Sequence, residues 1–142
     1  MDLKEFEKEL DYWINQAESE LHCFNPDGGV LEIRNIMLNL YNLNMLRWFF
    51  LPEKKGLMVY SITPDFRGNR SINEVFMYIL PEHRGNIRLF KQLVVHLEEI
   101  AKTEECNAVR IASNIGYNDE LVLKCLQRFG YKTDVVVKYL KG

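Results

Sequence analysis

Residues 84–88, Arg-Gly-Asn-Ile-Arg, combine cationic side chains with a permissive backbone and could bind an anion. An amphipathic stretch follows them, so the chain is expected to turn here into a helix, whose first N–H groups lack intrahelical partners and attract phosphate. Gly85 permits close approach to the backbone, Asn86 tolerates a positive φ, and Arg84 and Arg88 can each grip a phosphate with two hydrogen bonds. The residues alone leave a second interpretation open, a polar turn with two solvated arginines.

Length and composition restrict what these residues could belong to. The chain has 142 residues, of which 47% are hydrophobic and 27% charged, a balance that predicts one globular domain over residues 1–142. The formal net charge of −2 makes general nucleic-acid binding a poor fit. Three widely spaced cysteines without a C-x-x-C pair argue against a metal site and indicate a reducing, cytoplasmic location. No apolar run reaches the roughly 18 residues that a membrane span needs.

The elements that must position the turn follow from hydrophobic periodicity. Apolar residues at helical spacing predict helices, and short aromatic and β-branched runs between charged turns predict strands. The expected order is α-α-β-β-β-α-β-α-β, which indicates one mixed sheet with helices packed on it. The predicted helices are 3–21, 30–41, 87–105 and 118–130, and the predicted strands are 45–51, 56–63, 72–80, 107–113 and 131–141.

Three short motifs occur in a fixed order along residues 72–141. Ile79-Leu80-Pro81 ends a strand, Arg84-Gly85 opens the loop, and Phe129-Gly130-Tyr131 follows the last helix. This ordered set resembles the GNAT N-acetyltransferase superfamily, whose members show a strand ending V-x-P, a loop R-G-x-G-x-G/A and a late G-F motif. The glycine-poor loop would make the chain a divergent member, of a type that occurs in phage genomes.

The resemblance implies a fold and a ligand. The fold would be α+β, with a single mixed, mostly antiparallel twisted sheet of about six strands flanked by about four helices, in one GNAT-like acetyltransferase domain. The ligand would be acetyl-CoA as co-substrate, with no metal. Main-chain groups of Tyr78, Ile79 and Leu80 would pair with the pantetheine arm. The pyrophosphate would lie against Arg84, Gly85, Asn86, Ile87, Arg88 and Leu89, and CoA would also contact Asn114 and Asn118, which serve equally well as turn or cap residues.

The implied reaction is direct attack of a primary amine on the thioester, with an unknown small-molecule or protein acceptor. Glu74 on the preceding strand is the candidate base, and a solvent-facing structural carboxylate is the alternative. Leu126 stands where the family often has a tyrosine that serves as the general acid. Tyr117 or Tyr139 could take this role, and many members of the family work without the tyrosine. Cys125 beside it is expected in the core.

Asn86 and Arg88 are the other departure from the family pattern, because in a shortened loop they stand where the family has glycines that let phosphate approach. Asn86 is tolerable there since it accepts a positive φ, whereas Arg88 has a bulky side chain. The Arg88 side chain would either obstruct the phosphate or pair with it, and the sequence leaves both open. The sequence therefore supports two functions: an acetyl-CoA-dependent N-acetyltransferase, or a catalytically inactive GNAT-fold binding or structural protein. It leaves the oligomeric state open, with a homodimer among the options.

Overall fold

The computed structural model describes residues 2–21, 30–85, 87–111 and 119–133, together with Lys138 and Leu140. The chain divides into two compact units. The sheet unit comprises Asn35–Ala112, and the terminal unit comprises Met1–Arg34 with Ser113–Gly142.

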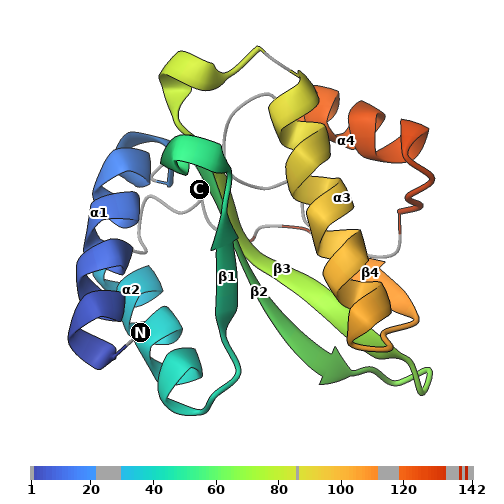
Figure 1. Cartoon of the computed structure of the whole chain (residues 1–142), viewed down its shortest axis with the longest axis horizontal. Coiled ribbons are helices and arrows are strands. Elements are labelled where there is room, and N and C mark those ends of the chain that lie inside the picture. The colour runs from blue at the N-terminus through green and yellow to red at the C-terminus, as the bar shows by residue number, and fades with distance from the viewer. Residues whose placement is uncertain are drawn as a thin grey trace. The chain divides into compact units, whose positions relative to one another are not determined.

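The sheet unit is built on four strands in the order β1-β2-β3-β4. The first three strands are antiparallel neighbours, whereas β4 runs parallel to β3 and is reached through the helix α3 (Figure 1). A parallel pair needs such a crossover, because a short hairpin reverses the strand direction. The elements are β1 (Arg47–Phe50), η1 (Pro52–Lys54), β2 (Gly56–Pro64), β3 (Arg70–Ile79), η2 (Pro81–His83), α3 (Ile87–Thr103) and β4 (Ala108–Arg110).

The core of the sheet unit lies between the sheet and α3. Leu93, Leu97 and Ala101 follow one another at intervals of four residues and are buried against the strands, as the helical periodicity predicts. The sheet contributes the rest of the buried cluster: Leu51, Met58, Tyr60, Ile72, Met77 and Ile79. On α2 (Val30–Asn42), whose later part belongs to this unit, Tyr41 contacts Trp48 of β1, with ring centroids 6.1 Å apart.

A β-bulge interrupts β3 at Val75. Tyr60 pairs with Glu74 and Val59 pairs with Phe76, so Val75 has no partner in β2. Side chains of a regular strand alternate between faces, and residues five apart would lie on opposite faces. Ile72 and Met77 nevertheless share the buried cluster against α3, because the extra residue restores their common face.

A polar network fixes the hairpin between β2 and β3. The Asp65 carboxylate accepts the backbone N–H groups of Arg67 and Asn69, at 2.9 and 3.0 Å, and a 3.2 Å hydrogen bond from Nη2 of Arg110 on β4. Burial by itself would raise the pKa of Asp65, but these hydrogen bonds and the charge of Arg110 lower it overall. The network therefore ties the hairpin to β4.

The terminal unit contains α1 (Leu3–Leu21), the start of α2 (Val30–Asn42) and α4 (Asp119–Arg128). Arg34 holds α2 to α1 through a 2.6 Å bond from its Nε to Asp11. At the end of α4, the N–H of Gly130 donates to Gln127 and the N–H of Tyr131 donates to Leu126, which is a Schellman motif. Gly130 has a φ of +96°, a left-handed conformation that glycine adopts readily at the end of a helix.

Several boundaries and one count differ from the sequence predictions. Within the described residues the sheet has four strands, so the expected six strands and the full predicted order are not matched. Within the described residues, the strand predicted over 107–113 is Ala108–Arg110, which pairs with Ser71–Asn73 of β3; residues 112 and 113 lie outside the described residues. The strand predicted over 131–141 falls largely outside the described residues. The single-domain assignment stays a prediction.

Candidate functional site

Among the described strands, β3 has neighbours on both sides only near its beginning. Ser71, Ile72 and Asn73 pair with β4, whereas the antiparallel ladder with β2 extends along the strand to Ile79. No described strand pairs with the other edge of β3 beyond Asn73. Unpaired strand edges present rows of N–H and C=O groups that can bind an extended molecule.

The groups on this open edge can be assigned from one hydrogen bond. The N–H of Leu80 donates to the carbonyl of Lys55 at 3.0 Å, so it points toward β2, whereas the carbonyl of Leu80 accepts the N–H of His83 in the following turn. Main-chain groups of successive residues point to alternate sides of a strand. Those of Met77 and Ile79 therefore face the open edge, and those of Tyr78 face β2.

The predicted base Glu74 lies immediately before the bulged residue Val75. It is half-buried, and its cross-strand neighbour in β2 is Tyr60. Burial raises the pKa of the Tyr60 phenol above its usual value, so that side chain stays protonated at neutral pH. The structure thus places one carboxylate and one irregular backbone position next to each other on β3.

In the loop after β3, Gly85 adopts a backbone conformation that requires a permissive residue, as the sequence predicts. Gly85 has a φ of +85°, a conformation that side-chain-bearing residues rarely adopt, and α3 begins two residues later at Ile87. Arg84 does not simply extend from this loop. Its Nε donates to the carbonyl of Ile79 at 2.8 Å, and its guanidinium carbon lies 4.9 Å from the centre of the Tyr78 ring.

The other predicted cofactor residues divide by exposure. Tyr78, Ile79 and Leu80 are buried, with 1%, 5% and 9% of their surface exposed, so only their main chain could meet a ligand. Ile87 and Arg88 are exposed on the first turn of α3. Leu89 packs against the core. Asn86, Asn114 and Asn118 lie outside the described residues, as do Tyr117 and Tyr139.

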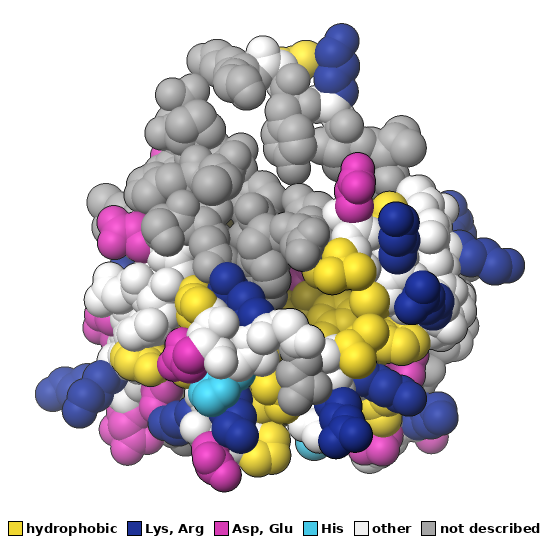
Figure 2. Space-filling view, turned by 90° about the horizontal axis from the view of Figure 1, so that it is seen from above, with side chains coloured by type: hydrophobic (Ala, Val, Ile, Leu, Met, Phe, Trp, Pro, Cys, Tyr) yellow, Lys and Arg dark blue, Asp and Glu magenta, His cyan; other side chains and the backbone are white. Residues whose placement is uncertain are grey.

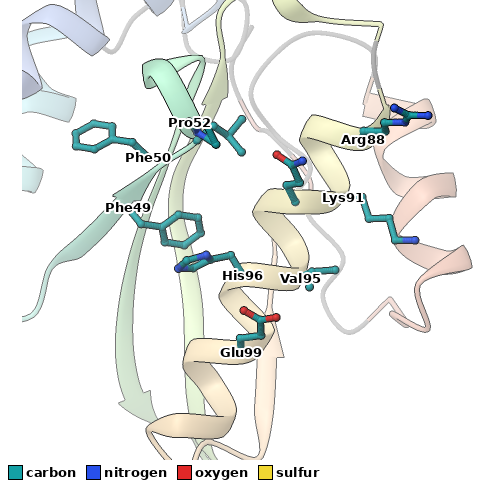
Figure 3. Close-up of a pocket in the computed structure, with 10 residues that line it drawn as sticks. Phe49, Phe50, Pro52, Arg88, Lys91, Val95, His96 and Glu99 are labelled. Atoms are coloured by element: carbon teal, nitrogen blue, oxygen red, sulfur yellow. The ribbon is translucent and has the colours of Figure 1, made fainter.

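A groove of about 500 Å³ lies elsewhere in the sheet unit, between β1 with η1 and α3. Figure 3 shows the ring of His96 against Phe49, and their centroids are 4.2 Å apart. Arg88 and Lys91 project from the other side of α3, away from Phe49 (Figure 3). Among the predicted cofactor residues that the structure describes, only Arg88 lines this groove, so it does not coincide with the open edge of β3.

The groove was not predicted, although two signals for it were present in the sequence. Alternation along 47–50 places Phe49 on the face opposite Trp48, and His96 is next to the core residue Leu97. In the structure, His96 is exposed and its ring lies against Phe49. What periodicity could not show is that β1 and α3 approach each other without closing the gap between them.

The surface chemistry agrees with the acidic composition. On the face shown in Figure 2, Lys and Arg side chains are interspersed with Asp and Glu side chains. Among the described residues, no group of three or more His, Cys, Asp and Glu side chains is placed to hold a metal ion. None of the described helices is long and apolar enough to cross a membrane.

Comparison with known proteins identifies the fold. No family model matches the chain, and no curated protein matches it. Solved structures do match: a probable acetyltransferase shares 13% identity over 94% of this chain and 91% of its own, with a TM-score of 0.67. The chain has a GNAT acetyltransferase fold.

Two further acetyltransferases with this fold carry ligands. A predicted acetyltransferase from Clostridium acetobutylicum, solved with acetyl-CoA, shares 16% identity over 95% of this chain and 91% of its own, with a TM-score of 0.66. The aminoglycoside N-acetyltransferase AAC(6')-Iy, in complex with CoA, shares 15% identity over 92% of this chain and 90% of its own, with a TM-score of 0.61. At these identities the likeness concerns the fold.

Proposed function

We propose that the chain is an acetyl-CoA-dependent N-acetyltransferase that moves the acetyl group to a primary amine. The observation that carries the proposal is the open edge of β3, which leads through the Gly85 turn directly into the N-terminus of α3. An extended amide-containing arm fits an unpaired strand edge, and a pyrophosphate fits a helix N-terminus. Solved acetyltransferases with this fold hold acetyl-CoA or CoA, which supports the same ligand here.

In this proposal, the main chain of Met77 and Ile79 pairs with the pantetheine arm. Tyr78 and Leu80 stay predicted neighbours of the arm, but the main chain of Tyr78 faces β2 and the N–H of Leu80 is bonded to Lys55. Met77 and Ile79 are therefore proposed as the direct partners. The first N–H groups of α3 and the exposed Arg88 side chain hold the phosphates. Gly85 keeps the approach to this turn free of a side chain.

The reaction is nucleophilic substitution at the thioester. A neutral amine attacks the carbonyl carbon, the carbon–sulfur bond breaks, and CoA leaves as a thiolate that takes up a proton. Glu74 accepts the proton lost by the amine, directly or through water. The bulge leaves Val75 without a partner in β2, so main-chain N–H groups around it can stabilise the oxyanion.

Thermal unfolding with and without acetyl-CoA tests the binding half of the proposal. A ligand at 100 times its dissociation constant should stabilise the protein by about 2.7 kcal/mol. The predicted result is a higher melting temperature with acetyl-CoA and no change with acetate. No shift at millimolar acetyl-CoA would exclude both the enzyme and a CoA-binding role.

Release of free thiol from acetyl-CoA, measured across a panel of amines, tests the catalytic half. Glu74→Gln should lower kcat by about 10² or more, as expected when a general base is lost, and should leave the affinity for acetyl-CoA nearly unchanged. Glu105→Gln, which removes an exposed carboxylate after α3, is the matched control. An unchanged kcat in Glu74→Gln would assign Glu74 a structural role.

One observation favours a second candidate, a GNAT-fold protein that binds without catalysing transfer. Leu126, at the position where the family often has an acidic tyrosine, is buried with 3% exposure and cannot donate a proton. Stabilisation by acetyl-CoA without thiol release from any amine would support this binding or structural role. The cytoplasmic location, the homodimer, the single-domain organisation and the divergent phage-type origin remain predictions from the sequence.

A further inference from the structure

We propose that Arg84 occupies the pantetheine position on β3 in the free protein, and that the phosphates of the ligand draw it away. Binding of the arm then depends on the phosphate end of the same ligand. Arg84 would thereby select CoA thioesters over pantetheine thioesters that lack the nucleotide. The inference rests on the proposed function and adds a determinant of ligand specificity to it.

Two contacts hold the Arg84 side chain against the end of β3. Its Nε–H donates to the carbonyl oxygen of Ile79 at 2.8 Å, within the range of a good hydrogen bond. Its guanidinium also lies over the Tyr78 ring, 4.9 Å from the centroid, a distance typical of a cation–π contact. The side chain is half-buried, so both contacts are partly protected from water. Arg84 is thus held back against the end of β3.

The hydrogen bond from Arg84 lies on the side of β3 where the ligand arm is proposed to bind. The N–H of Leu80 points toward β2, as its bond to Lys55 shows, and the carbonyl of Ile79, which belongs to the same planar trans peptide group, points the opposite way. The hydrogen bond to Ile79 must therefore approach from the open edge. An amide N–H of an extended ligand would seek the same carbonyl oxygen and would meet the guanidinium there.

A phosphate is a stronger hydrogen-bond acceptor for the Arg84 guanidinium than the Ile79 carbonyl. The Ile79 carbonyl is neutral, whereas a phosphate is charged and can accept two parallel hydrogen bonds from one guanidinium. A ligand with phosphates near the N-terminus of α3 offers Arg84 the better partner and frees the carbonyl. A ligand without phosphates must displace Arg84 by itself. Loss of one such bond corresponds to an affinity about five- to tenfold lower.

Calorimetric titration of the wild type and of Arg84→Ala with three probes tests the inference. Arg84→Ala should bind pantetheine about five- to tenfold more tightly than the wild type, because the carbonyl is already free. It should bind adenosine 3′,5′-bisphosphate more weakly, because a cation is lost. CoA, which contains both parts, should change less than either fragment. Arg67→Ala, an arginine of the β2–β3 hairpin, controls for the loss of one positive charge.

A second measurement uses the wild type alone. The Nε–H of Arg84 should give a protected signal in NMR spectra of the free protein, and that signal should shift when CoA is added. Unchanged or weaker pantetheine binding by folded Arg84→Ala, or an unprotected Nε–H, would refute the role of Arg84 while leaving CoA binding intact. Absence of CoA binding by the wild type would instead refute the proposed function, and this inference with it.

Discussion

The two ends of β3 differ in how many neighbouring strands their backbone pairs with. The closed end, Arg70–Asn73, is paired with β2 and β4, and Asn107 and Glu104 bind Arg70 in addition. The open end, Phe76–Leu80, is paired with β2 alone among the described strands. The closed end holds two strands and the hairpin together, so the open end need not be closed for the sheet to be stable. One strand thereby serves both stability and the proposed binding of ligand.

The largest expected effect tests the structural role of the closed end. Ile72 is fully buried in the cluster against α3, so Ile72→Ala should lower the free energy of unfolding by about 2–5 kcal/mol. Urea denaturation measures this loss. Ile87→Ala, beyond the open end and 51% exposed, should stay within about 0.5 kcal/mol of the wild type. Equal losses in the two variants would contradict the assignment of Ile72 to the core and of Ile87 to the surface.

A pair of glycines sharpens the comparison, with a smaller effect. Gly85 and Gly68 have φ values of +85° and +79°, and an added Cβ would meet no atom within 4 Å at either position. Alanine at either position should therefore cost about 1–2 kcal/mol through backbone conformation alone. Only Gly85→Ala should also weaken binding of acetyl-CoA, measured by titration of the folded variants. A similar loss of affinity in Gly68→Ala would remove the distinction between the ends.

The smallest effect concerns pH at the closed end. Because folding lowers the pKa of Asp65 from its usual 3.8, its ionised form stabilises the protein above about pH 4. That contribution is lost as the pH falls through the lowered pKa of the folded state. Asp65→Asn should be less stable than the wild type at pH 7, and the difference should shrink as the pH falls below about 4 and through the lowered pKa of the folded state. Denaturant unfolding at several pH values measures it, and a difference that grows on acidification would contradict the assignment.

Periodicity predicted the helices and most strands because each buries one regular face. The stripe of Leu93, Leu97 and Ala101 is an example: apolar residues four apart lie on one side of a helix, and the structure places them in the core. The positive φ of Gly85 also agrees with the expectation that this turn needs a permissive residue. These features depend on neighbours along the chain, so the sequence alone could indicate them.

The features that escaped prediction depend on contacts between distant segments. Nothing in the residues around Val75 marks it as a bulge, since that follows from the register with β2. The extent of pairing between β3 and β4 depends on how far the two strands run side by side, and these strands are distant in the sequence. Arg84 was expected to face a phosphate, and an arginine after a strand has no local preference that would direct it to Ile79 instead. The roles of the predicted cofactor residues and of Glu74 remain predictions.

Because of the bulge at Val75, the number of residues in β3 determines which side chains face α3. A different side chain at this position would keep Ile72 and Met77 on their common face, because the count of residues is unchanged. Removal of one residue between them would turn every following side chain to the opposite side of the sheet. Phe76 and Tyr78 would then point at α3 in place of Met77 and Ile79. Sequence comparison across this segment should therefore treat a one-residue gap as more consequential than any substitution.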